Sequence, residues 1–165
     1  MMLFKDALTI LKKSKEFKEW KKKNLDAYLS YGFFVVEKHS DNWKIGFYHK
    51  KEDKITSFNI GKKIIVKPEE EVFKKDKTMV KKIDLEKVNL DLDEAIKNAI
   101  EFQKKEFSNE NPQKIIAILQ NIEIGQVWNI TFITQNLNTL NIKIDSYNGR
   151  VLDKKLTNLM EFKKK

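Results

Sequence analysis

The sequence predicts an α+β protein of two repeated units, each an N-terminal helix packed on an antiparallel meander sheet of three to four strands. Two segments have apolar residues at helical three- and four-residue spacing, and each is followed by segments that alternate with period two. With 165 residues, 41% of them apolar, the chain can form one domain or two small ones with a real core. Eleven Phe, three Trp and four Tyr argue against a disordered polar chain.

The first unit is expected to cover residues 1–67. An amphipathic helix is predicted from Phe4 to Lys23, where apolar residues form one stripe and lysines fill the other face. Aromatic and β-branched runs then predict strands, which lie at 31–37, 43–48, 54–60 and 62–67. Residues 68–88 are polar with short apolar pieces, so we expect an ordered connector there.

The second unit is expected over residues 89–165. Asp91 and Glu94 fit the reciprocal capping pattern at a helix start. Strands are predicted at 114–122, 126–134 and 139–145, with a last one beginning at Arg150-Val151. The segment 139–145 alternates most regularly, as in a sheet buried on one side.

The two halves match each other at one ungapped offset. Trp43 and Trp128 are 85 residues apart, and the same shift brings Ile10 onto Ala95. The match predicts that each Trp-led middle strand aims its alternate side chains at its own helix. Burying three such side chains contributes about 2 kcal/mol apiece before entropy is deducted. The side chains in these two strands are Trp43, Ile45, Phe47, Trp128, Ile130 and Phe132.

The second unit resembles the PepSY domain in the helix start 92–96, the strand 127–132 and the segment 142–151. In that family a helix precedes a meander, and an Asp-Ala-x-Thr-Gly-like turn follows the third strand. Asp145 and Gly149 are retained here, while Ser146 and Asn148 replace Ala and Thr. The turn is also physically reasonable, because Gly149 can take a positive φ and Asp145 can bond nearby amides.

The PepSY resemblance covers residues 85–155 and extends to 5–65 only through the repeat. It implies a non-enzymatic module of a family associated with propeptides and peptidase inhibition, whose members are commonly exported behind a signal or membrane anchor. The sequence lacks a signal-like apolar region or any run of about 18 apolar residues, so we expect a cytoplasmic protein with no membrane partner.

The residues predict no enzyme, cofactor or metal site. The absence of cysteine excludes disulfides, thiolate metal sites and cysteine nucleophiles. His39 and His49 could bind a metal with Asp41 or Glu52, but histidines in turns and at strand ends are usually just exposed. No nucleophile motif surrounds a serine, and the glycines are isolated, so no phosphate-binding loop is expected.

The net charge of +9 has two interpretations. The 33 Lys+Arg residues include a single arginine, Arg150, so the basic charge lacks the planar fork that reads base edges. Most of this charge is explained by lysines on a solvated helix face and by the lysine-rich composition that an A+T-rich archaeal or bacterial genome produces. The alternative is a face that binds nucleic acid or another polyanion, formed by Lys12, Lys15, Lys18 and Lys22.

The leading functional expectation is a binding or regulatory protein whose partner is a protein or peptide. An unpaired sheet edge that accepts an extended peptide is one possible mode. Tyr31, Tyr48 and Phe58 could form an aromatic stacking platform, but packing between the two units is the favoured use of these rings. The sequence does not specify the oligomeric state.

Overall fold

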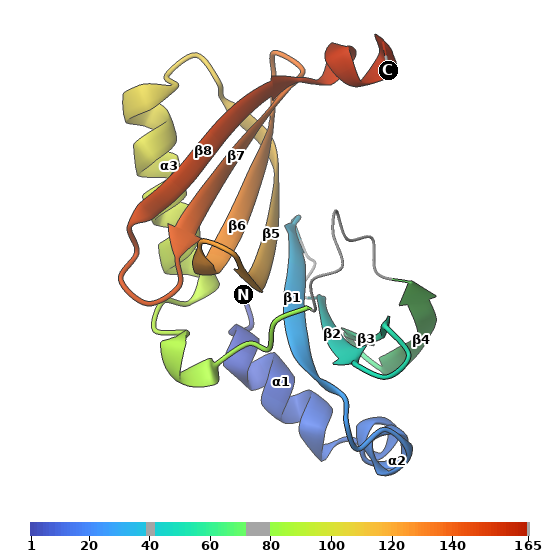
Figure 1. Ribbon diagram of the computed structural model, residues 1–165. Coiled ribbons are helices and arrows are strands. Elements are labelled where there is room, and N and C mark those ends of the chain that lie inside the picture. The colour runs from blue at the N-terminus through green and yellow to red at the C-terminus, as the bar shows by residue number, and fades with distance from the viewer. Residues whose placement is uncertain (39–41, 72–79, 165) are drawn as a thin grey trace.

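The computed structural model describes residues 1–38, 42–71 and 80–164, and their strands form one antiparallel sheet of eight strands (Figure 1). The order across the sheet is β4-β3-β2-β1-β5-β6-β7-β8. The strands are β1 (Tyr28–Val36), β2 (Trp43–His49), β3 (Lys54–Ile60), β4 (Ile64–Glu71), β5 (Pro112–Ile122), β6 (Gly125–Thr134), β7 (Asn138–Asp145) and β8 (Val151–Asn158). The helices are α1 (Phe4–Lys13), α2 (Lys15–Lys23) and α3 (Leu92–Glu106), with short 3₁₀ turns η1 (Leu85–Lys87) and η2 (Leu159–Lys164).

The expected fold of two repeated helix-plus-sheet units is wrong. β1 pairs antiparallel with β5, from Tyr31 opposite Gln120 to Val36 opposite Ile115, so the strands of both halves belong to one sheet. Two separate meanders would leave β1 and β5 with unpaired backbone groups along one edge each. Pairing them satisfies those groups and removes two exposed edges.

The hydrophobic core is also continuous across the sheet. The rings of Trp43 and Trp128 lie 6.1 Å apart, and Phe4 from α1 contacts both, at 5.3 and 6.3 Å. Both indoles are fully buried, and each N–H donates to a main-chain oxygen: Trp43 to Met2 at 2.9 Å and Trp128 to Leu90 at 3.0 Å. Burial of the two largest side chains therefore leaves neither N–H unsatisfied.

The helix predicted from Phe4 to Lys23 is broken at Ser14 into α1 and α2. Ser14 has an extended backbone (ψ 152°), and its hydroxyl oxygen accepts a hydrogen bond from Phe17 N at 3.1 Å. This is a helix N-cap, which stabilises a new helix start although no Gly or Pro is present. After the break, α2 directs Phe17 and Trp20 onto Phe47 and Phe58 of the sheet.

Local predictions in the second half are confirmed. Asp91 Oδ1 accepts from Glu94 N at 3.2 Å and Glu94 Oε2 accepts from Asp91 N at 3.3 Å, which is the expected capping box. Figure 1 shows α3 lying alongside the strands β5–β8, and α1 alongside β1.

The connector expected at residues 68–88 is described only in part, because residues 72–79 lie outside the described ranges. After them, Ile83 is buried in the core, and η1 follows it.

We expect Gly32→Ala to lower the free energy of unfolding by about 1–3 kcal/mol, because it overpacks the core. A Cβ at Gly32 would lie 2.4 Å from the ring of Phe4, which cannot retreat because it contacts both buried tryptophans. Urea unfolding measures the change. Gly61→Ala is the matched control, since its Cβ meets only the exposed Asn42 side chain; equal midpoints for the two variants would contradict this packing.

Candidate functional site

The two faces of the sheet differ in what covers them. On the first face, alternate residues of every inner strand pack with the buried side chains of α1, α2 and α3 in one cluster. On the opposite face, none of the helices in the described ranges contributes to the packing, and most side chains are half-buried. We call this second face the uncovered face, because no helix of residues 1–38, 42–71 and 80–164 packs on it.

The centre of the uncovered face is apolar. Phe33 and Val35 of β1 lie directly opposite Ile118 and Ile116 of β5, and all four are half-buried. Because β1 and β5 are the two middle strands of the sheet, this patch lies at the centre of the face. Tyr31 extends the row of alternate residues along β1.

Tyr31 is held across the sheet by a glycine on the neighbouring strand. A Cβ built at Gly46 would lie 2.1 Å from the Tyr31 ring, so the ring occupies the space above this glycine. Gly46 is paired with Tyr31 in the β1–β2 ladder, next to a bulge at Ser30. Any larger residue at position 46 would displace the ring.

A hydrogen-bonded polar cluster lies beside the apolar centre on β6, β7 and β8. Asn141 Nδ2 donates to Asn129 Oδ1 at 2.5 Å and to Thr131 Oγ1 at 2.9 Å. Lys143 Nζ donates to Asn141 Oδ1 at 2.8 Å and to Asp153 Oδ2 at 3.3 Å. The hydrogen bond from Lys143 and its charge hold the pKa of Asp153 below its ordinary value. An apolar centre with an ordered polar border is the usual anatomy of a protein-binding surface.

The residues that carried the PepSY resemblance have structural positions in this fold. The side chains from the middle strands and α3 are all buried in the core: Trp43, Ile45, Phe47, Ala95, Trp128, Ile130 and Phe132. Asp145 Oδ1 accepts from Tyr147 N at 2.8 Å and from Asn148 N at 3.0 Å, and Gly149 has φ +77°, as the turn chemistry predicted. These residues build the scaffold and do not line the uncovered face.

The proposed polyanion face is divided between two helices. Lys15, Lys18 and Lys22 are exposed on α2, where Lys15 lies 3.8 Å from Glu19, whereas Lys12 lies in the last turn of α1. The break at Ser14 separates Lys12 from the row on α2, so the four lysines do not share one helix face. Lys12 instead lines a cleft beside α2.

The described histidine and two of the three candidate platform aromatics are buried, so they form neither the metal site nor the stacking platform considered from the sequence. His49 was expected to be exposed, but it is buried: its Nε2 lies 2.9 Å from Thr56 Oγ1, and its ring packs on Trp20. His39 and Asp41 lie outside the described residues. Within residues 1–38, 42–71 and 80–164, no cluster of three metal-ligating side chains occurs.

Phe58 and Tyr48 are buried, so they form no platform with Tyr31. None of the helices described is long and apolar enough to cross a membrane.

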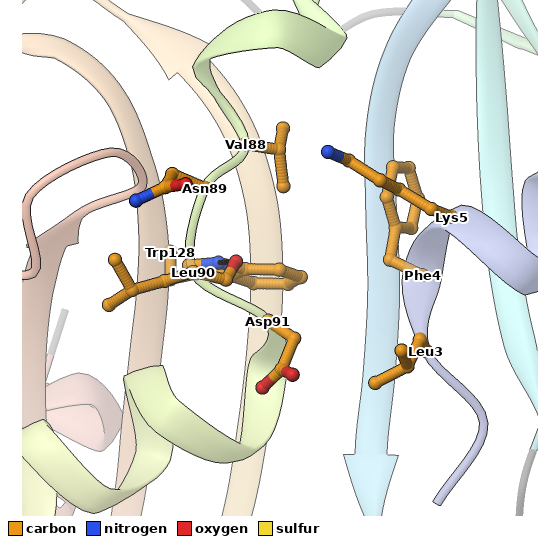
Figure 2. A pocket seen from close by; sticks show the side chains of 8 residues that line it. All are labelled: Leu3, Phe4, Lys5, Val88, Asn89, Leu90, Asp91 and Trp128. Atoms are coloured by element: carbon orange, nitrogen blue, oxygen red, sulfur yellow. Dashed lines mark hydrogen bonds between the residues drawn. The ribbon is translucent and has the colours of Figure 1, made fainter.

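A cavity of about 200 Å³ lies between the start of α1 and the segment 88–91 (Figure 2). Phe4, Trp128 and Leu90 form apolar walls, and Figure 2 shows Lys5 reaching from α1 toward the segment 88–91. The polar groups here already have structural roles, because Leu90 O accepts from Trp128 and Asp91 caps α3. The volume is below that of typical small-molecule sites, so we regard this cavity as a packing defect between the two halves.

One nearly buried carboxylate was missed by the sequence analysis. Glu110 accepts hydrogen bonds from Thr134 Oγ1 at 2.8 Å, Asn138 Nδ2 at 3.0 Å and Asn136 Nδ2 at 3.5 Å. Burial would raise its pKa, but these hydrogen bonds outweigh burial and hold the pKa below 4.5. The three partners lie at the end of β6, in the following turn and at the start of β7, so Glu110 ties the β6–β7 connection to the segment that joins α3 to β5.

Comparison with known proteins supports the fold. No family model and no curated protein matches the chain. The chain is similar to the crystal structure of a "putative lipoprotein" from Clostridium difficile 630, with 18% sequence identity, a TM-score of 0.63, and coverage of 94% of this chain and 93% of that one. At this coverage the likeness spans both halves of the chain, which agrees with one continuous fold and corrects the expectation of a tandem repeat. It gives no support to the expected cytoplasmic location.

We expect Glu110→Gln to destabilise the protein at neutral pH by about 1.5 kcal/mol, the typical value of hydrogen bonds to a charged group. The folded-state pKa is depressed, so the stabilisation is present above pH 4.5 and is lost as the pH falls through the folded-state value. The difference between wild type and variant should therefore shrink on acidification. Urea unfolding from pH 7 to pH 3 measures it, with the exposed Glu106→Gln as control; a difference independent of pH would contradict this role.

Proposed function

We propose that this protein is a non-enzymatic, PepSY-like binding protein that recognises an extended apolar segment of a protein or peptide on the uncovered face. The observation that carries the proposal is the row of half-buried apolar side chains on β1 and β5, bordered by an ordered polar cluster. Covering such a centre releases water from apolar surface, while the polar border supplies orientation.

The central face is favoured over the sheet edges as the binding surface. The edge strand β8 carries Asp153, Lys154 and Lys155 in succession, and charges of this kind oppose the addition of another strand. The other edge, β4, exposes Ile65 and Val66, so strand addition there is the competing mode for the same class of partner.

A binding role without turnover also fits the polar groups of the described chain. The nearly buried carboxylate of Glu110 is saturated by three side-chain donors, and buried His49 faces Thr56. These groups stabilise turns and strands, and neither lines the uncovered face. Because PepSY domains are associated with peptidase inhibition, we include a peptidase among the proteins whose activity such binding would modulate.

The experiment is to select peptides against the full chain from a displayed random library and to measure the affinity of the best one. Replacing Phe33 and Ile118 together with Ser should weaken it at least tenfold, because central apolar side chains dominate such interfaces. Backbone amide shifts in NMR spectra should change along β1 and β5. Mass spectrometry should recover the peptide intact.

The matched control is the double variant Ile65→Ser and Val66→Ser, which removes two exposed apolar side chains from the β4 edge. It should bind the selected peptide with wild-type affinity. Thermal unfolding confirms that both variants are folded. Loss of affinity only in the edge variant would show that the peptide binds at the β4 edge and not on the uncovered face. A failure to select any binding peptide would refute the proposal.

A further inference from the structure

A second, larger cleft lies away from the uncovered face, where α1 and α2 meet the sheet and the segment 82–86. Its volume is about 650 Å³, within the range of small-molecule sites. Its apolar wall includes Phe17 of α2, Leu29 of β1 and Phe47 of β2. Three lysines, Lys12, Lys21 and Lys82, line the same cleft, although they come from three different segments of the chain.

Lys21 is fixed in place by the end of its own helix. Its Nζ donates to the main-chain oxygens of Ala27 at 2.7 Å, Leu25 at 3.1 Å and Asn24 at 3.3 Å. These three acceptors engage all three N–H donors of the ammonium and hold its charge at a defined position, so Lys21 acts on a ligand through its charge alone.

The other two lysines are close enough to act on Lys21. Burial lowers the pKa of Lys21; Asp26 opposes this, and the charges of Lys82 and Lys12 add to the lowering. Like charges brought together at the mouth of a cleft repel one another, and an anion placed among them would relieve the repulsion.

Acidic groups also lie at the cleft, and one of them is already engaged. Asp84 Oδ1 accepts a hydrogen bond from Glu86 N at 3.0 Å, so it caps the turn η1. Asp84 and Glu86 line the side formed by the segment 82–86. Among the lining side chains, three ammonium groups stand against two carboxylates, and Asp26, which lies outside the lining, offsets part of the charge of Lys21.

We propose that this cleft binds a small organic anion with an apolar body, such as a medium-chain carboxylate. The apolar body lies against the wall of Phe17, Leu29 and Phe47, and the carboxylate lies among Lys12, Lys21 and Lys82. Lysine serves here as a point charge, so no bidentate geometry is required of the ligand. This site is independent of the uncovered face and of the function proposed for it.

The test is titration of the full chain with decanoate, below its micelle-forming concentration, followed by calorimetry and NMR. Decanoate should bind and shift the amides around residues 12–29 and 82–86, and leave those of the β1–β5 patch unchanged. Decanol, which lacks the charge, and acetate, which lacks the chain, should each bind at least tenfold more weakly.

Replacing Lys12 and Lys82 with Gln should weaken decanoate binding at least tenfold. Both side chains are exposed, so the fold is not at risk, and the circular dichroism spectrum and melting temperature check this. The control Lys15→Gln and Lys18→Gln removes the same charge from α2 outside the cleft and should change the affinity less than twofold. Equal weakening in both double variants, equal affinity for decanol, or no binding of decanoate would overturn the proposal.

Discussion

The pairing of β1 with β5 is the constraint on which the rest of the structure depends. Each half of the chain forms a four-stranded antiparallel meander, and the six-residue ladder between them turns two meanders into one sheet. The pairing brings Trp43 and Trp128 onto the same side of the sheet, where Phe4 packs against both. The ladder and the aromatic contact reinforce one another, because each fixes the relative position of the two halves.

The same pairing creates the surface that we propose for binding. Phe33 and Ile118 belong to different halves and become neighbours only through the β1–β5 ladder. The helices of the described residues pack on the opposite side with the core, so none of them covers the apolar centre of the uncovered face. Rigidity comes from the sheet, and recognition comes from side chains that project from its middle strands. A surface built in this way needs no loop to close over the ligand.

The sequence allowed the elements to be predicted well and their assembly poorly. Period-two alternation identified the strands, and the Asp91–Glu94 spacing identified the start of α3, because both depend on local contacts. The pairing of Tyr31–Val36 with residues 115–120 depends on distant parts of the chain, and nothing in either segment marks its partner. The break at Ser14 was hidden because serine is tolerated within helices as well as at their starts. The lysines could be counted, but only the fold shows that Lys12, Lys21 and Lys82 share a cleft.

The contact of one phenyl ring with two indoles limits how this protein can evolve. Phe4 sits above Gly32 and touches Trp43 and Trp128, so four positions from distant segments must change together if any of them changes size. Exposed side chains on the outer strands, such as Ile65 of β4 and Leu156 of β8, do not have this packing restriction. Among homologues, therefore, this quartet should vary as a set, while the lysine-rich exterior differs from one genome to the next.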